Sequence, residues 1–110
     1  MKDLKKYLLD ILNTISVIEE ISASLTIQDM DNASVRWALE RGISIIGEAV
    51  YQADKLQKGL AITNLVRIKN TRHIIVHDYD IVDRQQIFII VQKHLPLLKS
   101  EVENILKNLA

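Results

Sequence analysis

The sequence contains no cysteine, one proline and three glycines in 110 residues. Without cysteine the chain can form no disulfide, no thiolate nucleophile and no cysteine-ligated zinc site. Proline and glycine most often interrupt regular structure, and their scarcity favours a few long helices over many short strands. A chain of this length is expected to form one domain, residues 1–110, that buries a core without covalent cross-links.

The chain also lacks a net charge, a long apolar run and a leader-like N-terminus. Fourteen basic residues balance fourteen acidic ones, which argues against a protein that coats nucleic acid through its overall charge. No apolar run approaches the ~18 residues of a membrane span. The N-terminal stretch MKDLKKYLLDILNTI is charged throughout and has no apolar core with a small-residue cleavage site. We therefore expect a cytoplasmic protein with no membrane contact.

Apolar residues recur at intervals of three and four along most of the chain, the spacing of amphipathic helices. A polar, turn-like segment at residues 24–32 separates the first two helices, and Asp31, Asn32 or Ser34 is the expected N-cap of the second. Pro96 is expected to mark a break or a new first turn. The spacing predicts helices over residues 2–23, from the cap to 54, 60–77, 83–91 and 98–109. The expected fold is all-α: a compact up-and-down bundle of four to five helices.

Two features of these helical segments need an explanation. Gly42 and Gly47 lie inside the second predicted helix, where each costs about 1 kcal/mol relative to alanine. A close approach of another helix is the expected compensation. β-Branched residues are frequent at 74–76 and 87–91, so a strand at residues 88–91 competes with the fourth helix, although segment length and context favour the helix.

One segment of this neutral chain is strongly basic. Between Asp54 and Asp78 there is no acidic residue. The same segment contains two of the three histidines and the basic residues Lys55, Lys58, Arg67, Lys69 and Arg72. A solvated helix face usually mixes both signs of charge. The pattern indicates a site for a phosphate-bearing ligand, and a basic patch without a ligand is the alternative.

The densest reactive chemistry is the stretch RHIIVHDY at residues 72–79. Arg72 supplies a fixed cation with a planar fork of donors, which suits a phosphodiester. His77 can move a proton at neutral pH without a metal. On a helix, His77 stands about 140° around the axis from Arg72 and ~7.5 Å further along it, which is a poor geometry for a direct pair. A site shared by two copies across a two-fold axis would relieve that mismatch.

Each of these residues also has an ordinary structural interpretation. His77 could satisfy a carbonyl in the last turn of a helix, and Arg72 could form a surface ion pair with Asp78 or Asp80. Tyr79 could be an amphipathic bundle residue with a solvated hydroxyl. A metal held by two histidines four residues apart is disfavoured, because Asp78 does not share their face and Arg72 would repel a cation.

Residues 72–79 resemble the signature of the HEPN superfamily: arginine, four to six residues, histidine, any residue, tyrosine. In particular they are similar to the HepT-type toxins of prokaryotic toxin–antitoxin pairs. Two further stretches support the resemblance: ALERGISIIGEA at residues 38–49, and HLPLL at residues 94–98, similar to the family's step into its last helix. Together the three stretches extend the resemblance over about residues 1–109.

The resemblance implies a metal-independent endoribonuclease that needs no cofactor and works as a homodimer, with the two Arg–His pairs facing each other. The RNA 2′-OH would be the nucleophile, with His77 as general base or acid and Arg72 stabilising the charge on phosphorus. Lys69, His73 and Arg67 are the candidate contacts to the RNA substrate. For the HepT branch the resemblance also implies a minimal nucleotidyltransferase antitoxin as partner, with Tyr79 as the acceptor of AMP.

This sequence departs from the family pattern at two positions. The family commonly has asparagine directly after the motif arginine, where this chain has His73, which affects the expected geometry and pH optimum more than the class of activity. Ser44 stands where an acidic or amide residue is common. Two other functions stay open: a non-catalytic HEPN module that binds nucleotide or supports a nucleotidyltransferase, and a structural helical domain with an accidental resemblance. A small nucleotidyltransferase in the adjacent reading frame would favour the toxin.

Overall fold

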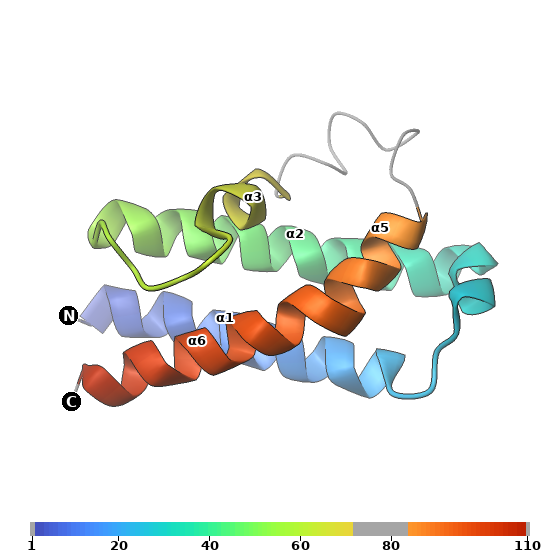
Figure 1. The fold of residues 1–110 in the computed structure, drawn as a ribbon, viewed down its shortest axis with the longest axis horizontal. Helices are drawn as coiled ribbons and strands as arrows, with labels where there is room; N and C mark the ends of the chain where they lie inside the picture. Colours follow the sequence, from blue (N-terminus) through green and yellow to red (C-terminus); the bar gives the residue numbers. More distant parts are fainter. Residues whose placement is uncertain (1, 72–83, 110) are drawn as a thin grey trace.

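The computed structural model describes residues 2–71 and 84–109. Within these ranges the chain is helical and contains no strand, so the all-α prediction is confirmed, and residues 86–91 are helical as expected. The elements, in chain order, are α1 (Lys2–Ser22), the 3₁₀ helix η1 (Ile27–Asp31), α2 (Ala33–Leu56), α3 (Leu65–Asn70), α5 (Arg84–Ile89), the π-helical turn η3 (Ile90–His94) and α6 (Leu95–Asn108) (Figure 1). None of these described helices is both long and apolar enough to cross a membrane.

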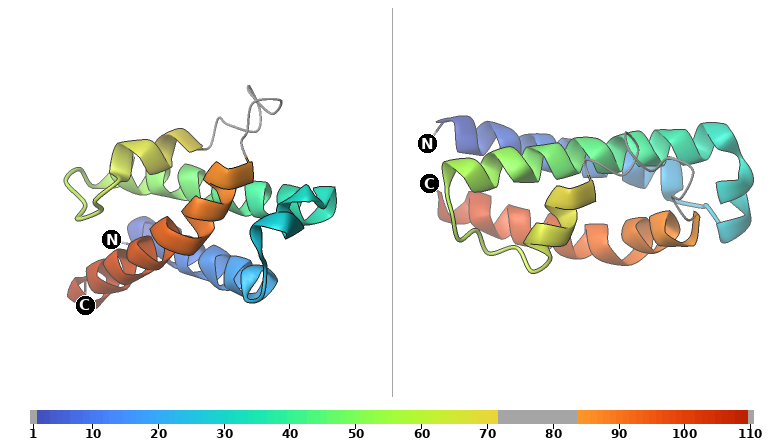
Figure 2. Two further views of the ribbon diagram at one scale, coloured as in Figure 1. Left: turned by 45° about the vertical axis from the view of Figure 1, so that its right-hand side comes forward. Right: turned by 90° about the horizontal axis from the view of Figure 1, so that it is seen from above.

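The body of the bundle consists of α1, α2 and the C-terminal helices. α1 packs against α2 and against α6 and runs antiparallel to both, so α1 begins and α6 ends at the same end of the molecule (Figure 1, Figure 2). The short α3 lies against α2. α5, η3 and α6 follow one another without an intervening loop. In the chain, the motif segment therefore follows the short helix α3, which packs on α2, and precedes the C-terminal helices α5, η3 and α6.

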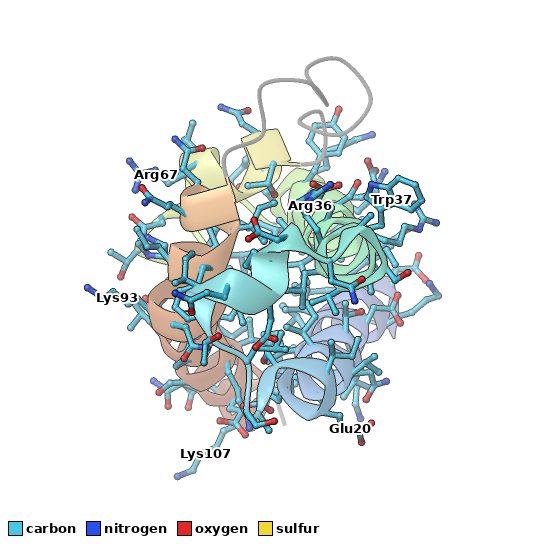
Figure 3. All side chains as sticks on the ribbon, turned by 90° about the vertical axis from the view of Figure 1, so that its right-hand side faces the viewer. Glu20, Arg36, Trp37, Arg67, Lys93 and Lys107 are labelled. Carbon is cyan, nitrogen blue, oxygen red and sulfur yellow. The ribbon has the colours of Figure 1, made fainter. Side chains whose placement is uncertain are left out.

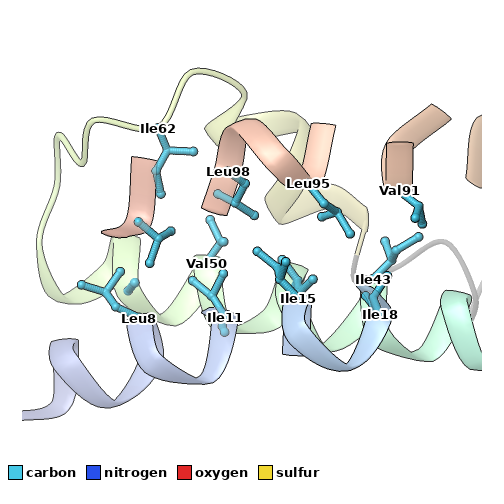
Figure 4. Packing of buried hydrophobic residues seen from close by; sticks show 14 of the residues in the cluster. Leu8, Ile11, Ile15, Ile18, Ile43, Val50, Ile62, Val91, Leu95 and Leu98 are labelled. Carbon is cyan, nitrogen blue, oxygen red and sulfur yellow. The ribbon is translucent and has the colours of Figure 1, made fainter. Parts of the chain in front are cut away.

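The core follows the predicted periodicity of α1. Its inward face is formed by Leu4, Leu8, Ile11, Ile15 and Ile18, each at most 2% exposed. These side chains meet Val50 of α2 and Leu98 of α6 in one continuous cluster (Figure 4). Burying a leucine or isoleucine side chain stabilises a fold by about 1.5–3 kcal/mol. The α1 stripe is thus the main reason why these helices stay together.

The close helix approach predicted from glycine occurs at Gly42. A Cβ atom built on this residue of α2 would lie 2.6 Å from Cδ1 and 2.8 Å from Cγ1 of Ile18 on α1. Only hydrogen fits at that position unless Ile18 moves. Gly47 is also buried in α2. The absence of a side chain at Gly42 lets the α1–α2 pair pack closely enough to form the core.

Asn32 is the N-cap of α2 among the three candidates. Its Oδ1 accepts hydrogen bonds from the backbone N–H groups of Ser34 at 2.9 Å and Val35 at 3.4 Å. Two of the unpaired donors at the start of the helix are satisfied in this way. The turn-like segment before the cap includes η1, which buries Met30 completely against the core.

The predicted start of the third helix at residue 60 is wrong. α3 begins at Leu65, because Leu60 and Ile62 are both buried, and residues two apart do not share one face of a helix. The carboxylate of Glu101 on α6 then accepts hydrogen bonds from Thr63, from Oγ1 at 2.6 Å and from the backbone N–H at 3.0 Å. These contacts hold residues 60–64 as an extended turn. Residues 72–77 of the predicted helix lie outside the described residues.

Pro96 does not interrupt the C-terminal helix. The alternative of a new first turn is confirmed: α6 begins at Leu95, and proline occupies its first turn. The π-helical turn η3 precedes it, and the backbone N–H of Leu95 donates to the carbonyl of Ile90, five residues back. Proline has no N–H to continue an α-helical ladder. The wider hydrogen-bonding pattern before Pro96 lets the helical run pass through it.

Candidate active site

The segment that carries the predicted catalytic residues joins α3 to α5. Arg72, His73, His77 and Tyr79 lie outside the described residues, and their roles stay predictions. The described neighbours on the two sides are Thr71 at the end of α3 and the first turn of α5. These flanking elements determine where the motif segment starts and ends.

Thr71, the residue before Arg72, is held against the middle of α2. Its side chain is buried, and its hydroxyl lies 2.6 Å from the carbonyl oxygen of Ile68 in α3. The same hydroxyl lies 3.4 Å from the carbonyl oxygen of Ile43 in α2. The shorter bond satisfies a carbonyl near the end of α3, where helices leave such groups unpaired. The chain therefore enters the motif from a fixed point on α2.

Asp54 anchors the other side of α3. Its Oδ2 lies 2.9 Å from Nζ of Lys69 and 3.2 Å from Nζ of Lys58. The hydrogen bond from Lys69 lowers the pKa of Asp54 below its ordinary value, burial opposes the shift, and Lys58 adds to it. A carboxylate held by two ammonium groups stays charged at neutral pH. Lys69, a predicted RNA contact, is thus also the residue that ties α3 to the end of α2.

Arg67 points away from that pair. Its side chain is exposed and lines a groove of about 250 Å³ together with Gln86 of α5 and His94 of η3. Among the residues that the structure describes, Arg67 has no ion-pair partner. Two of the three predicted RNA contacts are therefore separated within one short helix: Lys69 faces α2, and Arg67 faces the C-terminal helical run.

Three further polar side chains have environments that the sequence did not predict. Asp54 lies directly before the acid-free stretch and forms ion pairs with two of its lysines, Lys58 and Lys69. The positive potential of that stretch is therefore weaker than the number of basic residues suggests. His94 and Arg67 are distant in sequence, and only the fold brings them to the same groove. Glu40 of α2 is nearly buried, and burial raises its pKa while Arg36, with Nε 3.9 Å away, lowers it. The Arg36–Glu40 and Asp54–Lys58 pairs follow the local i,i+4 spacing, whereas the burial of Glu40, the Asp54–Lys69 contact and the position of His94 depend on the fold.

No metal site emerges within residues 2–71 and 84–109: no group of three or more histidine, aspartate or glutamate side chains is placed to hold an ion. The polar groups around α3 are instead arranged in cation–carboxylate pairs and a basic groove. In chemical terms this arrangement suits an anionic ligand.

The helices α1 and α2 present apolar side chains along one face. A groove of about 420 Å³ is lined by Val17, Ile21 and Ile45, all of which are exposed. An adjoining groove of about 460 Å³ contains Asp10 and Arg41. In Figure 3, Trp37 of α2 projects from one side of the molecule and Arg67 from the other. An apolar surface of this kind is typical of a protein–protein contact.

Comparison with known proteins agrees with the family that the sequence resembles. Residues 11–105 match the family model described as ribonuclease HepT-like. The chain is 28% identical over 104 residues to "Putative RNase MJ1380" of Methanocaldococcus jannaschii, an alignment that covers 93% of this chain and 95% of that protein. It is 26% identical over 110 residues to "Putative RNase MJ0125" of the same organism, covering 98% of this chain and 95% of the other. No solved structure gives a significant match.

Proposed function

Because the chain belongs to the HepT-like ribonuclease family of the HEPN superfamily, we propose that it is a metal-independent endoribonuclease and the toxin of a toxin–antitoxin pair. The observation that carries the proposal is the position of the motif: Arg72, His77 and Tyr79 fall inside the matched region, residues 11–105, with the spacing of the HEPN signature. Both relatives carry the name "Putative RNase". The basic groove beside α3 adds a surface suited to a polyanion.

The reaction needs only groups that this motif supplies. The ribose 2′-oxygen attacks the adjacent phosphorus while its proton passes to a base, and the bond from phosphorus to the 5′-oxygen breaks as that oxygen gains a proton. The products are a 2′,3′-cyclic phosphate and a 5′-hydroxyl. His77 moves the protons, and Arg72 stabilises the negative charge that builds on the non-bridging oxygens. Because the nucleophile is part of the substrate, no activated water is required.

The working unit in this proposal is a homodimer. On a single helix Arg72 and His77 are poorly placed to contact each other directly, and a second copy brings another Arg–His pair to the same substrate. The exposed apolar side chains of Val17, Ile21 and Ile45 give a second copy a surface to cover. The neighbouring groove carries both Asp10 and Arg41, so a two-fold contact can pair opposite charges across the interface.

Regulation is assigned to Tyr79 and a minimal nucleotidyltransferase antitoxin. The phenol oxygen of Tyr79 attacks the α-phosphorus of ATP, pyrophosphate leaves, and AMP stays bound to the tyrosine. The added phosphate brings negative charge next to Arg72 and occupies the space of the RNA phosphate. The modified toxin then no longer binds its substrate.

RNA cleavage in EDTA tests the central claim. The purified chain is incubated with single-stranded RNA, and the new ends are analysed for cyclic phosphate. Arg72→Ala and His77→Ala should each lose activity by roughly 100- to 10,000-fold, the range of a general acid–base contribution. Lys107→Ala, which removes an exposed cation at the end of α6, is the matched control and should cut normally. Normal cutting by either motif variant would remove that residue from the mechanism.

A further inference from the structure

The groove between α3 and η3 brings together residues that are distant in sequence. Arg67 of α3 lies on one side, and Gln86, Ile89 and His94 of the C-terminal run lie on the other. A smaller cavity of about 30 Å³ beneath it shares Arg67 and His94 and reaches the apolar core. The groove therefore has a cationic wall, an amide, an imidazole and an apolar floor.

The electrostatic character of the groove comes from two stretches of the chain that contain no acidic residue and that meet at the groove. No aspartate or glutamate occurs from residue 55 to 77, and none occurs from residue 84 to 100. The first stretch contains α3 and the second contains α5 and η3. Two described carboxylates that flank these stretches are already bound: Asp54 to Lys69, and Glu101 to Thr63. Among the residues that the structure describes, the lining of the groove contains an arginine and a histidine and no carboxylate, which points to an anionic ligand.

The backbone of η3 is itself unusual. A π-helical turn contains one more residue per hydrogen-bonded ring than an α-helix, is rare, and occurs frequently at functional sites. Here it ends at His94, so the wider turn presents the imidazole to the groove. Lys93 precedes His94 and projects from the same side of the molecule as Arg67 (Figure 3). The geometry of η3 is thus an observation independent of charge that marks the same place.

The groove also lies close to the end of α3, the point where the described chain stops before the motif. Thr71 lines the cavity beneath it, and Thr71 directly precedes Arg72 in the chain. A polymer held in the groove would need to cross only a short distance to reach that end of α3. Because the groove lies so close to the end of α3, directly before the motif, we expect its ligand to be part of the substrate and not an unrelated molecule.

We infer that the groove between Arg67 and His94 is a second RNA subsite, which holds one unpaired nucleotide flanking the scissile bond. The inference rests on the proposed ribonuclease function and adds the part of the substrate that is bound without being cut. The planar guanidinium group of Arg67 donates hydrogen bonds to the phosphate. The base stacks on the His94 imidazole above Ile89, and the amide of Gln86 donates to the sugar or base. Stacking of this kind requires single-stranded RNA, because bases inside a duplex are already stacked.

The test measures binding separately from cutting. The probe is a short, fluorescently labelled 2′-O-methyl RNA, which has no free 2′-OH and cannot be cleaved, and binding is followed by anisotropy at several salt concentrations. Arg67→Ala should weaken binding on the order of tenfold and reduce the slope of log affinity against log salt by about 0.7, the value for one phosphate contact to a single strand. His94→Ala should weaken binding by roughly fivefold or more, the loss expected for one stacked base.

Two further variants make the test specific. His94→Phe keeps a stacking surface and should retain most of the affinity, whereas His94→Gln keeps polarity and should not. If Arg67 and His94 hold the same nucleotide, the double alanine variant should lose less than the product of the two single losses. Lys107→Ala removes a distant cation and should bind as wild type. Thermal unfolding identifies any variant that fails to fold. If the His94 variants do not fold, the test rests on Arg67→Ala and Gln86→Ala, because both of these side chains are exposed.

The outcomes separate this inference from the ribonuclease proposal. Wild-type cleavage with undiminished probe binding in both Arg67→Ala and His94→Ala overturns the subsite and leaves the ribonuclease intact. Absence of cleavage, with the predicted binding losses, overturns the ribonuclease and supports the subsite. A wild-type protein that does not bind the probe overturns the subsite as well.

Discussion

Nζ of Lys69 lies 2.9 Å from Oδ2 of Asp54 and joins the short helix that leads into the motif to the end of α2. The Asp54 carboxylate is almost completely buried, and the Lys69 ammonium is only partly exposed. Lys58, whose side chain is exposed to solvent, forms an ion pair with the same carboxylate oxygen. α3 has only six residues, too few to be a stable helix without tertiary support. The pair is therefore a structural condition for a correctly placed motif.

Replacing Asp54 should destabilise the fold and disturb the motif. Asp54→Asn keeps the size of the side chain but leaves Lys69 without its charged partner, so the free energy of unfolding should fall, as measured by urea titration. The matched control is Glu19→Gln, because the exposed Lys99–Glu19 pair is worth no more than about 1 kcal/mol. An equal effect of the two variants would mean that the Asp54 pair is no stronger than a surface pair.

The Asp54 contribution should also depend on pH. The pKa of Asp54 is lowered in the folded chain, so its stabilisation is present above the ordinary value of 3.8 and disappears as the pH falls through the folded-state pKa. The difference in unfolding free energy between wild type and Asp54→Asn should therefore be largest near neutral pH and shrink in acid. A difference that stays constant from neutral pH into acid would assign the effect to packing instead of charge.

Glu40 should show the opposite pH dependence. Burial raises its pKa above the ordinary value of 4.5, so the charged form at neutral pH opposes folding, and that penalty disappears when the pH falls below the ordinary value. Glu40→Gln should raise the unfolding free energy near neutral pH and have little effect at low pH. Measuring both variants from neutral pH into acid also tests the Arg36 contact, which acts against the shift. A destabilised Glu40→Gln at neutral pH would show that Arg36 outweighs burial.

Gly42→Ala should destabilise the α1–α2 pair, because its Cβ would meet Cδ1 of Ile18 at 2.6 Å. Overpacking of a core costs about 1–3 kcal/mol, and the better helix propensity of alanine offsets about 1 kcal/mol of that. Ile18→Ala removes both atoms in conflict, Cδ1 and Cγ1, and alone costs about 2–5 kcal/mol. In a double-mutant cycle by thermal unfolding, the combined variant should lose less than the sum of the two. Additive losses would show that the contact is not the cause.

The proposed dimer predicts a specific effect of charge on the α1–α2 face. Ile45→Glu should convert a dimer to a monomer at micromolar concentration, measured by light scattering, because it places a carboxylate inside the apolar groove with Val17 and Ile21. Leu97→Glu is the matched control: Leu97 is similarly exposed, at 44% against 37% for Ile45, but lies on α6. Dissociation by Leu97→Glu alone would move the interface to the C-terminal helices.

Local sequence patterns predicted those parts of the fold that local forces determine. The α1 stripe and the Asn32 cap depend on spacing within one segment, and both lie where expected. The extended turn at residues 60–64 depends on Glu101, thirty-eight positions away from Thr63, which no local pattern could reveal. The groove is non-local in the same sense, because Arg67 belongs to the third predicted helix and His94 lies between the last two. The identity of the motif was available from the sequence, and its polar surroundings required the fold.

Tyr79 should be a point of control and not a catalyst. The ordinary pKa of a tyrosine phenol is near ~10, too high for easy proton exchange with His77 at neutral pH. Tyr79→Phe should therefore keep substantial RNA cleavage but escape silencing by the partner nucleotidyltransferase and ATP. Tyr51→Phe, a change on α2, is the control for loss of a phenol elsewhere. Intact-mass spectrometry gives the readout: wild type and Tyr51→Phe should gain AMP in the presence of partner and ATP, and Tyr79→Phe should not. Equal gain by all three proteins would place the modification on another residue and exclude Tyr79 from regulation.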